Sequence, residues 1–194
     1  MIYKFNNPTV PNIYLNIGHL IDHFMMLIFA KAAYDSGRYF GLNYDEMIIY
    51  GTLGMVLFGA TAPLAGFLSD KYGRMPLMIA YHFGIGISAI LASLSTSTYQ
   101  LAMCLALIGM FASIYHPVGI AMLLQRPGVV GLRMGINGVW GNMGIAVAPI
   151  VTGVLLYYGD WRLTFMVPGI ICIIFGILFF ISITSNDDSN SKEN

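Results

Sequence analysis

Three ionisable side chains lie close together in the first apolar segment of the chain: His19, Asp22 and His23. Spacings of three and four residues place them on one face of an α-helix, near its middle. A carboxylate at the centre of a membrane helix costs roughly 2.5 to 3.5 kcal/mol on insertion scales, so such a group faces a cavity or a partner. Asp22 is therefore our first candidate for a proton or substrate site. The alternative is a carboxylate locked to a neighbouring histidine, or to the apolar helix expected at 99–124, only to hold a helix bundle together.

These residues also raise the question of a metal site. His19, Asp22 and His23 could hold a metal ion, but no fourth ligand follows at a spacing typical of such sites. The two cysteines, Cys104 and Cys172, lie in apolar segments without C-x-x-C spacing. We therefore predict no metal, no disulfide and no cofactor.

A second candidate position is His116, in the sequence Tyr-His-Pro-Val-Gly at 115–119. Pro117 cannot donate a hydrogen bond to the carbonyl of Ser113, which predicts a kink and a polar break in a membrane helix. Histidine changes its charge near physiological pH, so His116 could respond to a proton gradient. The alternative is a histidine that only donates a hydrogen bond at the kink.

The composition indicates an integral membrane protein. Charged residues make up 9% of the chain and hydrophobic residues 57%, with a mean hydropathy of +0.73, whereas a typical soluble domain has about 25% charged residues. The formal net charge of zero provides no basic surface for a nucleic acid. Phosphate-binding, nucleophile-turn and H-E-x-x-H motifs are absent from the sequence, so we predict that the protein is not an enzyme.

Six apolar runs have the length that a bilayer-spanning helix needs. They cover approximately residues 12–34, 45–68, 76–94, 99–124, 134–157 and 163–183. We predict an all-α membrane protein with six transmembrane helices in one domain, residues 1–184. A polar tail at 185–194, rich in serine, asparagine and acidic residues, is expected to be disordered and cytoplasmic.

The basic residues predict the orientation of these helices, because cytoplasmic loops carry an excess of lysine and arginine. With the N-terminus inside, six basic residues are cytoplasmic: Lys4, Lys71, Arg74, Arg126, Arg133 and Lys192. Three lie toward the outside: Lys31, Arg38 and Arg162. We therefore expect a multi-pass protein of the plasma membrane with both termini in the cytoplasm.

An internal repeat relates the second and third helices to the fifth and sixth. The matched pairs are Pro63 with Pro149, Gly66 with Gly153, and Arg74 with Arg162. Because each unit has three helices, the two units would have opposite topology, giving a three-plus-three inverted repeat.

The charged turn between the second and third helices reads Gly66-Phe-Leu-Ser-Asp70-Lys-Tyr-Gly73-Arg74. This G-x-L-x-D-x-x-G-R pattern resembles the corresponding loop of the major facilitator superfamily of secondary transporters. The resemblance implies a conformational latch made by Gly66, Asp70, Gly73 and Arg74. In it, Gly66 would admit a close backbone, Asp70 would cap a helix and Arg74 would pair with a carboxylate. The alternative is a charged turn that only obeys the positive-inside rule.

Two further patterns resemble branches of that superfamily. The run Gly144-x-x-x-Ala148-Pro149-x-x-x-Gly153 is similar to the fifth-helix signature of drug and proton antiporters, with alanine in one glycine position. It predicts tight helix packing and a kink at Pro149. The His-Pro-x-Gly sequence at 116–119 resembles the fosmidomycin-resistance type of efflux protein. The arginine that many relatives carry in the fourth helix is missing here.

The resemblance implies a transporter of a small solute, with proton coupling through Asp22 and His116 and efflux as the direction. Superfamily members have about twelve helices, so the cavity face of six would meet lipid unless a second six-helix unit covers it. That unit could be a second copy or a separate chain. The other function class is a non-transporting protein, either a truncated remnant or an assembly partner. No motif encodes the substrate.

Overall fold

The computed structural model describes residues 12–126 and 128–192, with side chains described as far as residue 182. Within these ranges the chain consists of helices and their short connections, with no strand. Five helices are long and apolar enough to cross a membrane, and a bent pair supplies a sixth span. The all-α membrane fold predicted from the apolar runs is confirmed.

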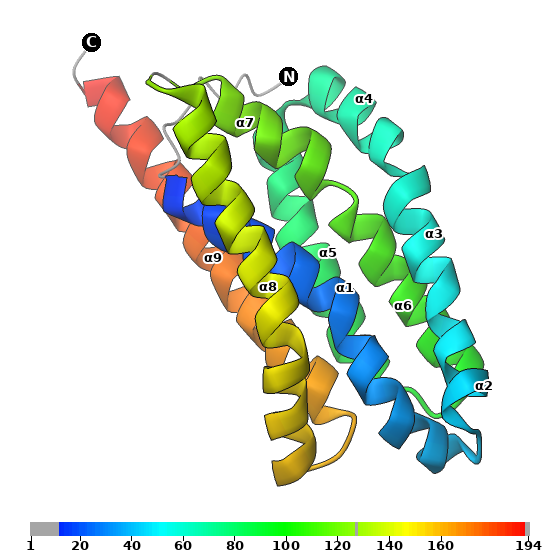
Figure 1. The fold of residues 1–194 in the computed structure, drawn as a ribbon. Coiled ribbons are helices and arrows are strands. Elements are labelled where there is room, and N and C mark those ends of the chain that lie inside the picture. Colours follow the sequence, from blue (N-terminus) through cyan, green and yellow to red (C-terminus); the bar gives the residue numbers. More distant parts are fainter. Residues whose placement is uncertain (1–11, 127, 193–194) are drawn as a thin grey trace.

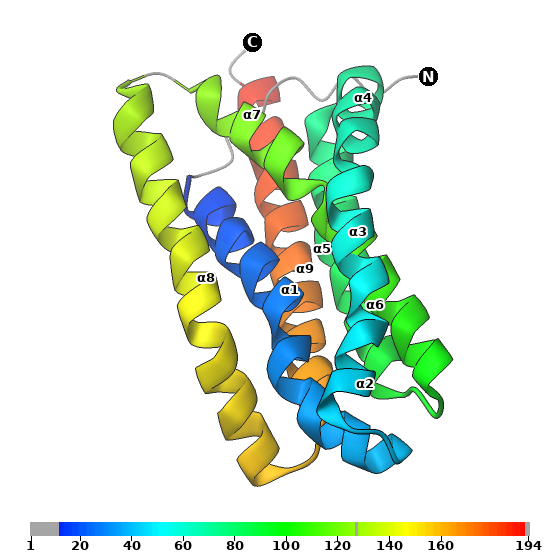
Figure 2. The ribbon, with the colours of Figure 1, turned by 45° about the vertical axis from the view of Figure 1, so that its right-hand side comes forward.

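The six spans follow each other along the chain in Figures 1 and 2. The first span is α1 (Asn12–Phe40), and the second is divided into α2 (Tyr44–Ile48), a 3-10 turn (Ile49–Gly51), α3 (Thr52–Ala60) and α4 (Ala62–Tyr72). The third is α5 (Arg74–Ser93), and the fourth comprises α6 (Thr98–Ala112), a π-helical turn (Tyr115–Gly119) and α7 (Ile120–Leu124). The fifth and sixth are α8 (Val130–Tyr158) and α9 (Leu163–Lys192).

The second span is bent, where the sequence predicted one continuous helix. The segments 44–60 and 62–72 meet at Thr61 with an angle of 44°. Pro63 follows the bend and cannot donate a hydrogen bond to the preceding turn, which explains why the helix changes direction there. Pro63 lies in the first turn of α4, where a proline is favourable. The apolar pattern continues through the bend and therefore did not show it.

The fourth span is irregular around His116, and this confirms the break expected at Pro117. A π-helical turn, Tyr115–Gly119, replaces the regular α-helix between α6 and α7. The hydroxyl oxygens of Thr61 and Ser113 lie 2.8 Å apart. The irregular part of the fourth span therefore lies directly against the bend of the second.

The helices pack in an order that agrees with an inverted repeat. Among helices that are not consecutive in the chain, the most extensive packing joins α1 to α8, α5 to α9, and α3 to α6. In such a repeat, spans 1, 2 and 3 correspond to spans 4, 5 and 6. The α1–α8 pair (spans 1 and 5) then corresponds to the α6–α3 pair (spans 4 and 2), and the α5–α9 pair (spans 3 and 6) corresponds to itself. In Figures 1 and 2, α1 runs between α8 on one side and the α3–α6 pair on the other. The α4–α5 and α8–α9 connections lie at opposite ends of the bundle (Figure 1).

Glycines allow both exchangeable pairs to pack with close backbones. A Cβ atom added at Gly144 of α8 would collide with the carbonyl oxygen of Leu20 in α1. A Cβ atom at Gly109 of α6 would collide with the carbonyl oxygen of Gly54 in α3. Backbones at this distance replace side-chain packing, as in other small-residue membrane interfaces.

The last helix extends further than the sequence suggested. The backbone of α9 is helical to Lys192, whereas the sequence predicted a disordered tail from residue 185. The polar segment contains neither glycine nor proline, so it holds no residue that would stop the preceding helix. Residues 193 and 194, and the side chains from 183 onward, lie outside the described part of the chain.

Candidate functional site

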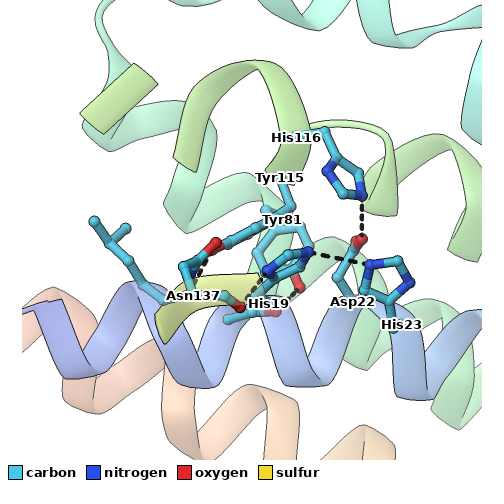
Figure 3. Close-up of polar contacts among 9 residues, drawn as sticks. His19, Asp22, His23, Tyr81, Tyr115, His116 and Asn137 are labelled. Carbon is cyan, nitrogen blue, oxygen red and sulfur yellow. Dashed lines mark hydrogen bonds and ion pairs between the residues drawn. The ribbon is translucent and has the colours of Figure 1, made fainter. Parts of the chain in front are cut away.

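The predicted coupling residues gather where α1 meets the π-helical turn (Figure 3). Asp22 is fully buried, and its Oδ2 atom lies 3.4 Å from Nε2 of His116. The ring of His116 also stands edge-on to those of His19 and His23, with centroids 5.3 and 5.4 Å away. One cluster therefore unites the two positions that the sequence singled out in separate helices.

Asp22 has little other compensation for its burial. Neither carboxylate oxygen accepts a hydrogen bond of normal geometry from the described residues, and the 3.4 Å contact exceeds the 2.7–2.9 Å of a charge-assisted hydrogen bond. A buried carboxylate in this setting is stabilised when it gains a proton or when a cation approaches. Its partner His116 is 36% exposed at its side chain, so that cation or proton has a route from the surface.

A second pair of contacts orients His19. Its Nδ1 atom lies 2.8 Å from the backbone carbonyl oxygen of Asn137 in α8. Because a carbonyl only accepts, we assign the proton to Nδ1 of His19, which leaves Nε2 as an acceptor. The Nε2 atom of His23 lies 3.1 Å from it and donates. The hydrogen bonds therefore run in one direction, from His23 through His19 to the carbonyl acceptor in α8.

A polar network beneath the cluster was not predicted from the sequence. The buried side-chain amide of Asn137 donates to Oδ1 of Asn16 at 3.0 Å and to the hydroxyl of Tyr115 at 2.9 Å. The Tyr115 hydroxyl in turn donates to the carbonyl oxygen of Leu15 at 2.6 Å. Two asparagines inside apolar segments were the available signal, since an intramembrane amide needs a partner. The network ties α1, the π-helical turn and α8 together around His19.

An apolar pocket of about 210 Å³ lies next to the cluster, along α1 toward its C-terminal end. It is lined from the first, second and fourth spans, chiefly by Met25, Met26, Phe29, Met55, Leu105 and Ile108. Methionine side chains are flexible and polarisable and adapt to apolar ligands of different shape. Met25 and Met26 of its lining lie about one helical turn along α1 from the buried carboxylate of Asp22.

The charged turn after α4 makes other contacts than those that the sequence suggested. Gly73 has a φ of +94°, a conformation that side chains disfavour. Arg74 donates to the backbone carbonyl of Ala121 in α7 at 3.3 Å, where the sequence suggested a carboxylate partner. Asp70 is exposed and no helix capped by it is among the described ones. Gly66 faces the side chain of Pro117 at ordinary contact distance, and the close backbone expected there is not observed.

A family comparison agrees with this arrangement. The sequence profile described as Major Facilitator Superfamily matches residues 8–194 of the chain. The protein belongs to the major facilitator superfamily. Its six spans correspond to one half of the superfamily fold. The turn at 66–74 lies between the second and third spans, as the loop that it resembles does in the superfamily.

Several relatives in this superfamily match parts of the chain. The puromycin resistance protein pur8 of Streptomyces alboniger is 31% identical over 54% of this chain and 22% of its own length. The nitrate/nitrite transporter NrtP of Nostoc punctiforme is 29% identical over 78% of this chain and 32% of its own length. A probable hexose phosphate transport protein of Chlamydia muridarum is 28% identical over 71% of the chain and 31% of its own length. The chain thus matches about a third or less of each relative. The narrower resemblance to fosmidomycin-resistance proteins stays a prediction.

The residues of the fifth-span signature have different surroundings in this superfamily member. Gly144 contacts the backbone of α1, as tight packing requires, whereas a Cβ atom at Gly153 would meet no atom within 4 Å. Pro149 lies inside α8, which continues without interruption from Val130 to Tyr158. Within the signature, Gly144 therefore makes the close helix contact. Among the described residues, none lies against Gly153, and Pro149 does not interrupt α8.

Proposed function

We propose that this chain forms one half of a secondary transporter that exports a small organic solute in exchange for protons. The observation that carries the proposal is the buried Asp22, paired only with His116 and adjacent to an apolar pocket. An intramembrane carboxylate is a functional-site candidate by default, because its cost persists only where function requires it.

The geometry offers a physical route for coupling. Asp22 lies on α1, and His116 lies on the π-helical turn, a type of helix irregularity common at functional sites. A proton that neutralises Asp22 removes its attraction for His116 and so changes the contact between the first and fourth spans. Movement of the two spans would then depend on whether the carboxylate carries a proton.

The pocket favours a substrate with an apolar body. Its lining is mainly methionine, leucine, isoleucine and phenylalanine, which suits an organic solute better than a small inorganic anion. Of the relatives reported above, the one named for puromycin resistance has the name that fits such a lining. We therefore place efflux of an apolar organic compound ahead of nitrate or sugar-phosphate transport.

The orientation follows from the positive-inside rule. The connections that contain Lys71, Arg74 and Arg126 lie at one end of the bundle, and Arg38 and Arg162 lie at the other (Figure 1). We propose that the first end faces the cytoplasm of a plasma-membrane protein. The latch would then act on the cytoplasmic side, where Arg74 holds the start of α5 to the carbonyl of Ala121.

A second six-helix unit would complete the transport path. The most apolar stretch of α8 is only 22% buried, and the side chain of His116 is 36% exposed. Lipid contact suits the apolar residues of α8 but not an ionisable cluster. A second copy or another chain would cover that face and enclose the solute.

The experiment is puromycin uptake into everted membrane vesicles, which is the direction that export from the cell takes there, under an imposed pH gradient, with the wild-type chain and three variants. We expect gradient-dependent movement of puromycin in the wild type and its loss in Asp22→Asn. Asp35→Asn is the matched control, because it makes the same change on α1 outside the cluster. If Asp22→Asn and His116→Ala both export puromycin at the wild-type rate, proton coupling at this site is wrong. No gradient-dependent movement in the wild type would favour the non-transporting protein.

A further inference from the structure

Three histidines in the cluster present ring nitrogens toward one another. One nitrogen from each of His19, His23 and His116 lies within 4.8 Å of the other two, and the Nε2 atoms of His19 and His23 are 3.1 Å apart. Figure 3 shows these rings converging from α1 and the π-helical turn. Four-coordinate zinc sites with Zn–N bonds of 2.0–2.1 Å need nitrogens about 3.3 Å apart. The first pair already has this separation, and a small rotation of His116 would bring in the third nitrogen.

The outer contacts of these histidines are those that metal ligands use. A metal-binding histidine generally donates its second N–H to a carbonyl or a carboxylate, which fixes the ring and its tautomer. His19 donates Nδ1–H to the carbonyl oxygen of Asn137 at 2.8 Å, so its Nε2 carries a lone pair, and a bound ion would take that lone pair in place of the N–H of His23 that Nε2 accepts. His116 directs Nε2 toward the carboxylate of Asp22 at 3.4 Å, so Nδ1 is available. Two of the three histidines are therefore held as ligands would be held.

From the sequence alone, we considered a different set of metal ligands. His19, Asp22 and His23 share a helix face, and without a fourth ligand they made a weak site. In the structure His116 takes the third ligand position, and Asp22 moves to the outer contacts behind it. Its negative charge would offset part of the charge that a cation brings into the membrane.

We infer that His19, His23 and His116 together bind one divalent transition-metal ion. Imidazole ligands suit zinc, copper and nickel ions, whereas magnesium and calcium require oxygen ligands. Three protein ligands leave one coordination position open. Water or a ligand could occupy it, because the side chains of His23 and His116 are partly exposed. This inference does not rest on the transport proposal.

The test is zinc binding by the purified protein in nanodiscs, measured by isothermal titration calorimetry with a tag that contains no histidine. The chain has four histidines in total, and His82 is buried in α5 against Phe175, with ring centroids 5.1 Å apart. His82→Gln is therefore the matched control. We expect one Zn²⁺ per chain, at least about tenfold weaker binding in His19→Gln, His23→Gln and His116→Gln, and wild-type binding in His82→Gln.

Two further readings separate metal ligation from a structural role. Asp22→Asn should weaken zinc binding by about 10- to 100-fold, as loss of an outer partner does, and Co²⁺ should give the visible absorption of a nitrogen-ligated ion. An excess of Mg²⁺ should not compete. Wild-type protein that binds no zinc, or binds it no more tightly than a variant lacking all three histidines, would overturn the inference. Solute and gradient are absent from this assay, so its result is independent of the export experiment.

Discussion

At the scale of single residues, the proposed function depends on how a buried carboxylate is compensated. Asp22 is fully buried, and Nε2 of His116 lies 3.4 Å from its Oδ2 atom. Removing one partner of a buried pair leaves the other uncompensated and costs more than removing the charge itself. The two residues are therefore unequal in their effect on stability, although they form one contact.

This inequality predicts the outcome of a double-mutant cycle. His116→Ala should lower the free energy of unfolding by on the order of 2 kcal/mol, less than in a fully buried pair because His116 is half-exposed. Asp22→Asn should cost less, and the double variant should resemble Asp22→Asn alone. Thermal unfolding in detergent measures the four proteins. Strictly additive effects of the two substitutions would show that the residues do not interact.

A second prediction at this scale concerns Gly73 in the charged turn. Its φ of +94° and ψ of 156° are nearly restricted to glycine, so Gly73→Ala should cost about 1–3 kcal/mol. Gly59→Ala, on an open face of α3 where an added Cβ meets nothing, should be neutral or slightly stabilising. Unfolding midpoints of the two variants give the comparison. Equal midpoints would mean that the turn adopts another conformation.

At the scale of elements, the α1–α8 contact positions the cluster. α8 supplies the carbonyl of Asn137 that orients His19, and Gly144 sets how closely the two helices approach. Any change that separates α8 from α1 should therefore disturb both the packing and the histidine geometry.

The glycines of α8 allow a matched test of this contact. Gly144→Ala places a methyl group against the carbonyl of Leu20 and should destabilise the fold by about 1–3 kcal/mol. Gly138→Ala adds the same methyl group to open space and should stabilise the helix by up to about 1 kcal/mol. Chemical or thermal unfolding in the same detergent distinguishes them. A Gly144→Ala protein as stable as Gly138→Ala would contradict the close packing of α1 and α8.

The elements also show what the sequence could predict. Long apolar runs and basic loops were sufficient for six spans, because bilayer thickness determines their length. Pro117 marked the π-helical turn, since a missing donor disrupts the local hydrogen bonds. The bend at Thr61 was missed because apolar periodicity continues through it. A contact of Asp22 with the fourth span was one of the alternatives raised from the sequence. That His116 makes this contact could not be predicted, because it depends on how α6 and α7 pack against α1.

At the scale of the whole molecule, the remaining question is what covers the cluster. The described chain packs α5 and α9 on one side of α1 and leaves much of α8 exposed. An ionisable cluster whose histidine side chains are partly exposed is not stable against lipid tails. The superfamily relatives match this chain over about a third or less of their length, which agrees with a path that requires a further six-helix unit.

The mass of the native assembly tests this central claim most directly. The protein would be extracted from its own membrane into nanodiscs and its mass measured by native mass spectrometry, together with any chain that accompanies it. We predict a stoichiometric complex in which a second six-helix unit, a second copy or another chain, joins this one. A single 21.3 kDa chain with no partner would contradict the enclosed path and the transport function built on it.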